Sequence, residues 1–272
     1  MAEPAPADAG TRPVLEWRHR GAQWSEAQAP LAVEQAVALE YNGIAHAVML
    51  ATPLDLEDFA LGFTLSEGIV ARASDVYEVE HRPGSAGHTL RVRIAAGAFA
   101  GLKERRRSLA GRTGCGICGT ESLDQVLRPL PPLPLGTARL APAALARATQ
   151  ELGAAQHLQQ LTGATHGAAW CDLDGTIRTV REDVGRHNAL DKLIGAMLRA
   201  RTPTAQGFAL ITSRASVEMV QKAATAGIGL LAAVSGPTTL AVETAQSCGL
   251  TLVGFARGMN FSVYSHRERI GK

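Results

Sequence analysis

The order of hydrophobic and polar positions predicts paired strands and two helices in the first part of the chain. Two apolar runs flank Asn42-Gly43, a strong signal for a two-residue hairpin turn. Thr52-Pro53-Leu54-Asp55 has the features of a helix start, with a capping Thr and a Pro at the first helical position. We therefore expect two strands within residues 32–50, a helix from 52 to about 68, strands at 76–81 and 89–95, and a helix at 99–109.

In the second part of the chain the pattern becomes an alternation of buried strands and helices. The predicted elements are a helix at 142–161, hairpin strands at 168–173 and 176–181, a helix at 187–201, a strand at 208–212, a helix at 216–226, a strand at 229–234, a helix at 238–248 and a strand at 250–255. Strands and helices that alternate in this way favour a parallel sheet covered by helices. The fold class is therefore α/β, with a smaller α+β part in front of it.

Composition marks two boundaries along the chain. Residues 1–12 are rich in Ala and Pro, and we expect them to be disordered. Residues 128–134 include four prolines, which can continue neither a helix nor a central strand. We therefore expect an N-terminal part at 13–134 and a C-terminal α/β domain at 135–272.

Charge and apolar content exclude several classes of protein. A net charge of +2 gives no support for a nucleic-acid partner, and the longest apolar runs, such as 227–234, are too short to span a bilayer. Residues 1–8 lack the pattern of a signal peptide, and four cysteines are too few for a secreted disulfide scaffold. These features favour a cytoplasmic protein with reduced thiols and no membrane partner.

Two of the four cysteines, Cys115 and Cys118, lie in a glycine-rich stretch at 112–119 that follows a basic run at 103–107. A structural zinc site needs four ligands, and no second Cys-x-x-Cys pair occurs, so the remaining ligands would have to come from distant positions. A thioredoxin-like redox pair normally begins a helix after a strand, which is not the pattern here. Both interpretations are weaker than one that uses an exposed thiolate.

Two further interpretations concern chemistry at the same loop. A zinc deaminase needs His-x-Glu followed by Pro-Cys-x-x-Cys, but Gly114 precedes Cys115 and no His-x-Glu occurs upstream, so that chemistry is rejected. A sulfur carrier needs an exposed, mobile thiol with a lowered pKa. The glycines provide the first two properties, and Arg112 with the basic run at 103–107 provides the third.

The chain resembles the FdhD family of formate dehydrogenase accessory sulfurtransferases. The segment Thr113-Gly114-Cys115-Gly116-Ile117-Cys118-Gly119 is similar to the signature loop of that family. Four further blocks follow in the family's order, at 165–169, 181–192, 212–214 and 255–258. The resemblance runs from about residue 30 to the end, and the long charged block at 181–192 makes it specific.

The resemblance implies a function and a set of site residues. Family members take sulfur from a cysteine desulfurase and deliver it to the molybdenum bis(molybdopterin guanine dinucleotide) cofactor, which is their bound substrate, before it enters the catalytic subunit of formate dehydrogenase. Cys115 matches the position that carries the persulfide, and Cys118 matches its partner. The positions that match the cofactor-contacting segment are Phe255, Ala256, Arg257, Gly258, Met259 and Asn260. The family also implies a homodimer, no resident metal, and a second half like the cytidine-deaminase three-layer α/β fold.

An anionic cofactor with flat rings needs backbone N–H groups, Arg and short polar side chains. Such groups follow three predicted strands, at 212–216, 235–238 and 255–260, and strand ends of this kind gather at one edge of an open α/β sheet. Taken singly, Ser213, Ser216 and Ser235 are more simply helix caps. Taken together, the three segments favour a ligand crevice.

Several other residues have both a structural and a functional interpretation. His166 and His187 are proton donors, ligand contacts or hydrogen-bonded structural residues. Four charged residues of the block at 181–192 either form an ion-pair network that holds the sheet or the dimer interface, or are part of the site: Glu182, Asp183, Arg186 and Asp191. Residues that we expect to be buried are Trp17, Trp24, Trp170, Cys171 and Cys248. A second hypothesis for the whole chain is a cofactor-binding chaperone, in which the cysteine pair is a redox or zinc clasp.

Overall fold

The computed structural model describes residues 10–110, 129–134 and 139–271. Its centre is a six-stranded sheet in the order β12-β11-β10-β9-β7-β8. The strands are β7 (His166–Asp172), β8 (Ile177–Asp183), β9 (Gly207–Ile211), β10 (Leu230–Ala233), β11 (Thr251–Arg257) and β12 (Asn260–Val263). β9, β10 and β11 are parallel, as the alternating pattern predicts, whereas β7 joins β9 antiparallel. The α/β fold class is confirmed.

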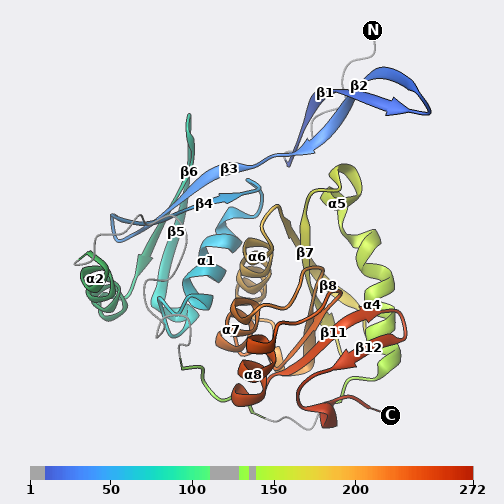
Figure 1. Cartoon of the computed structure of the whole chain (residues 1–272). Coiled ribbons are helices and arrows are strands. Elements are labelled where there is room, and N and C mark those ends of the chain that lie inside the picture. Colours follow the sequence, from blue (N-terminus) through green and yellow to red (C-terminus); the bar gives the residue numbers. More distant parts are fainter. Residues whose placement is uncertain (1–9, 111–128, 135–138, 272) are drawn as a thin grey trace.

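Helices cover both faces of this sheet, which gives three layers (Figure 1). The helices are α4 (Pro142–Ala155), α5 (His157–Thr162), α6 (Arg186–Arg199), α7 (Val217–Thr225) and α8 (Thr239–Cys248), with short 3-10 turns at Thr204–Gln206 and Arg267–Arg269. The apolar side of α4 packs on one face, against residues such as Phe208 and Leu210. α6, α7 and α8 pack on the other face, against residues such as Trp170 and Ile211. The single helix expected at 142–161 breaks at Gln156 into α4 and α5.

The N-terminal part is a second sheet with one helix against it. The sheet has the order β4-β3-β6-β5. Its elements are β3 (Gln35–Tyr41), β4 (Ile44–Ala51), α1 (Leu56–Ser66), a 3-10 turn at Ala73–Asp75, β5 (Val76–Gly84), β6 (Gly87–Ile94) and α2 (Ala96–Ala110). The predicted hairpin at Asn42-Gly43, the strand pair and both helices are confirmed. The predicted helix start is wrong, because Asp55 is the N-cap of α1 and the Thr52 hydroxyl instead accepts a hydrogen bond from Val184 N–H.

Helix α1 lies between the small sheet and α6, so the two parts share one hydrophobic core (Figure 1). Two glycines allow the helices to touch. A Cβ placed at Gly62 would lie 1.7 Å from the Asp191 carbonyl oxygen, and one at Gly195 would lie 1.9 Å from the Asp58 carbonyl oxygen. The backbones of α1 and α6 are therefore in direct contact.

Buried ion pairs reinforce this joint between the two parts. Lys192 and Asp183 are fully buried 2.7 Å apart, and both also bond to the backbone of Thr52 in the N-terminal part. Asp191 accepts hydrogen bonds from Lys222 at 2.8 Å and from the Ser66 hydroxyl at 2.5 Å. The charged block at 181–192 thus connects the C-terminal part to the N-terminal part.

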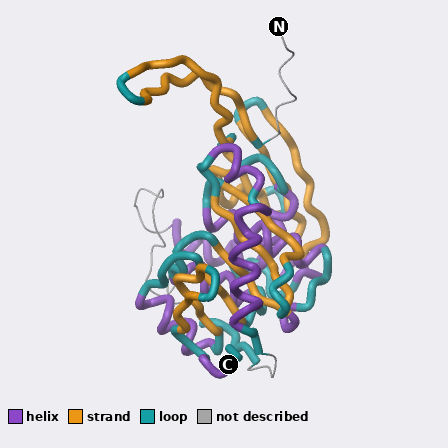
Figure 2. The backbone as a smooth tube through the Cα atoms, turned by 90° about the vertical axis from the view of Figure 1, so that its right-hand side faces the viewer, coloured by secondary structure: helices purple, strands orange, loops and turns teal. Residues whose placement is uncertain are grey.

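A two-stranded hairpin, β1 (Thr11–Arg20) with β2 (Gln23–Ala32), stands away from the body (Figures 1 and 2). β1 begins at Thr11, inside the segment that was expected to be disordered. The expected burial of two tryptophans in this hairpin is wrong, because Trp17 is 64% exposed and Trp24 is 68% exposed. Trp170, in β7, is buried as predicted. A projecting hairpin has no core of its own in which these rings could pack.

No helix among the described residues has both the length and the apolar character needed to cross a bilayer.

Candidate functional site

The three polar segments predicted to meet do lie side by side, at the carboxyl edge of the parallel strands. Ala215 N–H donates to the Gly236 carbonyl at 3.3 Å, and Thr238 N–H donates to the Ala215 carbonyl at 3.1 Å. Phe255 N–H donates to the Ser235 carbonyl at 3.1 Å. Segments 212–216, 235–238 and 255–260 therefore form one continuous polar edge.

The antiparallel strands bring further residues to the same edge. β7 begins there with His166, which lies opposite Asp183 at the end of β8, and α6 starts three residues later at Arg186. The Thr212 backbone N–H donates to the Gly167 carbonyl at 3.0 Å, which fixes the start of β7 beside the end of β9. The edge therefore runs from Asn260 at the start of β12 to Arg186 and His187 at the start of α6.

Segment 255–260 presents exposed groups on a constrained backbone. Phe255 has a left-handed φ of 54° and is 52% exposed. Its ring lies so close to Gly236 that a Cβ at that glycine would be 2.6 Å from the ring. A non-glycine residue in this conformation costs about 1–2 kcal/mol, and such strain concentrates at functional sites.

The rest of the segment supplies polar contacts around that ring. Arg257, Met259 and Asn260 are exposed, whereas Ala256 is fully buried and offers only its backbone. Gly258 also has a left-handed φ of 55°, and its N–H donates to the Thr149 hydroxyl at 3.1 Å. An exposed aromatic ring and an exposed guanidinium two residues apart suit a flat ring that carries an anionic group.

Helix capping does not account for the serines at this edge. Ser216 is the N-cap of α7, but its side chain makes no capping hydrogen bond to the described residues. The cap of α8 is Thr238, whose hydroxyl accepts from Ala241 N–H, rather than Ser235. The Ser213 hydroxyl donates to the Arg214 carbonyl instead of capping a helix. The simpler explanation is thus wrong for Ser213 and Ser235, whereas Ser216 has the predicted N-cap position without the side-chain hydrogen bond.

A model of the FdhD/NarQ family matches residues 32–271. The chain belongs to the FdhD/NarQ family. It is 58% identical to a protein of Variovorax paradoxus over 88% of this chain and 86% of that one. It is 54% identical to a protein of Cupriavidus necator over 97% of this chain and 91% of that one, and both relatives are named sulfur carrier protein FdhD.

A solved structure supports the fold of this FdhD/NarQ family member. The crystal structure of a candidate formate dehydrogenase accessory protein from Desulfotalea psychrophila superposes with a TM-score of 0.76. It covers 96% of this chain and 99% of that one at 23% sequence identity. The match extends over both sheets, so the arrangement of the two parts is that of a known fold.

The charged block of this FdhD/NarQ member divides between structure and site. Asp183, Asp191 and Lys192 form buried ion pairs at the joint between the two parts. Arg186 and His187 lie at the polar edge, and the Arg186 Nε and His187 Nε2 atoms are buried without a hydrogen-bond partner among the described residues. The expected ion-pair network of Glu182, Asp183, Arg186 and Asp191 is therefore confirmed for Asp183 and Asp191, which pair with Lys192 and Lys222. Among the described residues, Glu182 accepts hydrogen bonds from backbone N–H groups and Thr165 instead, and Arg186 has no ion-pair partner.

Both histidines at the edge are held neutral. Burial, followed by the charge of Arg186, lowers the pKa of His166. The same two causes, with a contribution from Lys222, lower the pKa of His187 to about 4. At neutral pH both rings therefore act as neutral hydrogen-bond donors or acceptors.

The cysteines fall into two groups. Cys115 and Cys118 lie outside the described residues. Cys171 and Cys248 are buried as predicted, and burial raises the pKa of both thiols, that of Cys171 to about 12. Neither buried thiol is available as a thiolate at neutral pH. Within the described residues, no three His, Cys, Asp or Glu side chains are grouped as metal ligands would be.

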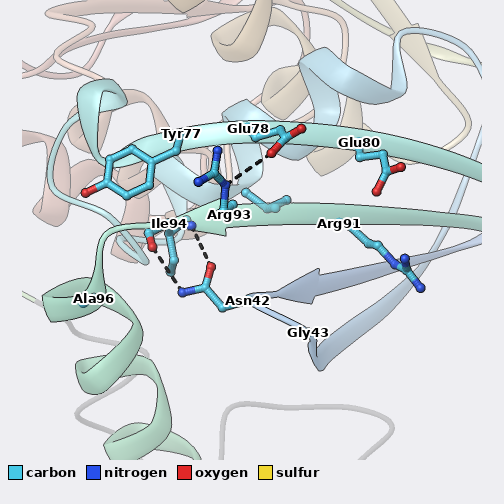
Figure 3. Close-up of a pocket in the computed structure, with 10 residues that line it drawn as sticks. Asn42, Gly43, Tyr77, Glu78, Glu80, Arg91, Arg93, Ile94 and Ala96 are labelled. Carbon is cyan, nitrogen blue, oxygen red and sulfur yellow. Dashed lines mark hydrogen bonds and ion pairs between the residues drawn. The ribbon is translucent and has the colours of Figure 1, made fainter.

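A separate cavity of about 570 Å³ lies on the outer face of the small sheet (Figure 3). Asn42 spans its floor, because its amide donates to the Ile94 carbonyl at 3.1 Å and accepts from Ile94 N–H at 2.9 Å. Arg93 on its wall is paired with Glu78 at 3.2 Å. Since these polar groups already have partners, the polar edge of the large sheet is the better candidate site.

Proposed function

We propose that this chain is a sulfur carrier that moves sulfur from a cysteine desulfurase to a molybdenum bis(molybdopterin guanine dinucleotide) cofactor destined for the catalytic subunit of formate dehydrogenase. The observation that carries the proposal is the membership in a family whose close relatives are named sulfur carriers. Burial of Cys171 and Cys248 leaves Cys115 and Cys118 as the candidate sulfur-carrying thiols.

The proposed transfer is a pair of thiol exchanges. The Cys115 thiolate attacks the outer sulfur of the donor persulfide, so that a Cys115 persulfide forms and the donor leaves as a thiolate. Cys118 then attacks the inner sulfur of that persulfide. This step forms a Cys115–Cys118 disulfide and releases the outer sulfur as sulfide to the cofactor. The two electrons that reduce the outer sulfur come from the Cys118 thiolate as the disulfide forms.

The cofactor in this proposal is a substrate that binds along the polar edge. The Phe255 ring stacks on a guanine or pterin ring, Arg257 pairs with a phosphate, and Gly258 allows the phosphate to approach the backbone. The exposure and strain of segment 255–260 support this assignment.

Intact-mass measurement tests the carrier function. Incubation with a desulfurase and cysteine should add the mass of one sulfur atom to the wild type and to Cys171→Ala, but not to Cys115→Ala. Cys118→Ala should accept the sulfur and fail to release it. A Cys115→Ala protein that still accepts sulfur and supports formate dehydrogenase activity would sink the proposal.

The exposed polar edge also supports a second candidate function, a cofactor-binding chaperone with the cysteine pair as a redox or zinc clasp. That function predicts full biological activity for the double variant Cys115→Ala/Cys118→Ala and loss of activity for Arg257→Ala. The carrier proposal predicts loss in both. We also propose that the chain is a homodimer, which light scattering of the purified protein will test.

A further inference from the structure

A second cavity, of about 460 Å³, lies at the amino end of β7, three strands away from β11 along the polar edge. Its walls include Gln156, Gln159, Thr165, His166 and Thr212. No Phe, Tyr or Trp lines it, so it lacks a surface on which a base would stack. The walls instead offer amide, hydroxyl and imidazole groups, which recognise a polar ligand.

Gln156 presents an unused hydrogen-bond donor to this cavity. The residue is 4% exposed, it separates α4 from α5, and its Nε2 has no partner among the described residues. A Cβ at Gly167 would lie 2.5 Å from that Nε2, so only glycine leaves room for the amide. Buried amides in folded proteins almost always have a partner. No described residue supplies that partner, so the Gln156 amide is available to a bound ligand.

The nearest carboxylate does not fill that role. Glu182 already accepts the N–H groups of Leu158 and Gln159 at 2.9 and 2.8 Å and the Thr165 hydroxyl at 3.0 Å. Its charge is thus held by the start of α5 and by Thr165. The carboxylate faces these donors and leaves the Gln156 amide unused.

A positive charge lies close to His166 on the cavity wall. Arg186 comes three residues after Asp183, which is opposite His166, and its charge contributes to the lowered pKa of His166. Asp183, opposite His166, is paired with Lys192 in the buried joint. Arg186 makes no ion pair with any described carboxylate, and its buried Nε is without a partner. Glu218 on α7 lies within the field of Arg186 but is not paired with it. Free donors beside an uncompensated guanidinium call for a ligand rich in acceptors and negatively charged.

We propose that this cavity binds the oxyanion of a phosphate or phosphoanhydride group, with Gln156 and His166 as hydrogen-bond partners and Arg186 as the counter-charge. Strands about 4.8 Å apart place β7 roughly 14 Å from β11, a span that one nucleotide arm can bridge. Naming the ligand as an arm of the cofactor rests on the proposed function. The oxyanion site itself stands without it.

Inorganic pyrophosphate is the first probe, with the full-length protein at low salt. Calorimetry should show one site per chain, and NMR should show a shift of the His166 ring signals with a higher pKa in the bound state. Arg186→Gln should weaken binding at least tenfold and Gln156→Leu severalfold. Arg72→Gln, at an exposed position of the N-terminal part, is the matched control and should bind like the wild type.

The proposal is overturned if pyrophosphate does not bind, or if Arg186→Gln and Gln156→Leu bind it with the same affinity as the wild type. The His166 shift in the wild type keeps the test valid even where a variant folds poorly. GDP separates this site from segment 255–260. Loss of GDP affinity in Phe255→Ala with unchanged pyrophosphate affinity supports both sites. Unchanged GDP affinity in Phe255→Ala, with pyrophosphate still dependent on Arg186, removes the assignment of segment 255–260 and leaves the oxyanion site intact.

Discussion

Replacing Lys192 by Met isolates the energy of the joint between the two parts of the chain. Met has nearly the length and volume of the Lys stem, so the change removes a charge without opening a large cavity. The lost contacts are the ion pair with Asp183 at 2.7 Å and the hydrogen bonds to the Thr52 carbonyl at 2.9 Å and the Glu182 carbonyl at 3.3 Å. The pair is fully buried, so the remaining carboxylate is left without a counter-charge.

The expected loss follows from what still surrounds that carboxylate. Breaking a buried pair on one side costs about 3–5 kcal/mol. Asp183 keeps hydrogen bonds from Thr52 N–H, Gly185 N–H and the Asn188 amide, which places the cost near the lower end. A loss of about 3 kcal/mol in the free energy of unfolding corresponds to a Tm lower by about 6–12 °C for a protein of this size.

Urea denaturation followed by circular dichroism measures this loss. The double variant Lys192→Met/Asp183→Asn removes the orphaned charge and should regain at least half of it. Lys103→Met, at an exposed position on α2, is the control and should change the free energy of unfolding by less than about 0.5 kcal/mol. The reasoning fails if Lys192→Met costs less than about 1 kcal/mol, or if the double variant is no more stable than the single one.

Three further predictions concern pH, packing and strain. The pKa of His187 is lowered to about 4 in the folded protein, whereas an unfolded chain titrates near pH 6.5. The free energy of unfolding should therefore be highest above about pH 6.5 and should fall as the pH drops toward 4. In His187→Gln, denaturation at stepped pH should show this fall reduced by roughly 2 kcal/mol. Gly195→Ala should cost about 3 kcal/mol because its Cβ meets the Asp58 carbonyl, whereas Gly101→Ala, with open space around it, should cost nothing; equal denaturation midpoints would contradict this. Phe255→Gly should keep or raise the free energy of unfolding by about 1 kcal/mol because it relieves the left-handed φ, yet should abolish GDP-induced thermal stabilisation; retained stabilisation would exclude stacking on this ring.

The sequence predicted the elements whose signals are local. The turn at Asn42-Gly43, the alternating strands and helices from β9 to β11, and the gathering of 212–216, 235–238 and 255–260 at one edge all follow from short-range patterns. The start of α1 did not follow, because Thr52 has the pattern of a helix cap but its hydroxyl accepts a hydrogen bond from Val184, which comes just after β8. A prediction from neighbouring residues alone cannot detect a hydrogen-bond partner that is distant in sequence.

The errors that matter most for function come from long-range contacts. The break at Gln156 interrupts a segment of good helix formers. It coincides with two long-range contacts that the local pattern does not contain: the Gln156 amide lies against Gly167 on β7, and Glu182 accepts the N–H groups of Leu158 and Gln159. Trp17 and Trp24 are exposed because their hairpin projects from the rest of the protein. The order of apolar and polar residues does not show whether a hairpin packs against another element. Arg186 was read as part of an ion-pair network because its sequence neighbours are, although its side chain has no such partner.

The direct contact of α1 with α6 has a consequence for the connectivity of the chain. Helix α1 precedes the segment between residues 110 and 139 and α6 follows it. The two helices meet through Gly62 and Gly195, and ion pairs such as Lys222–Glu67 and Arg181–Asp58 cross the joint. A cut in that segment would therefore leave two fragments that stay associated, since their cohesion resides in the interface rather than in the covalent link. Each fragment alone would expose the apolar face that the other one covers, so each part depends on the other to bury that face.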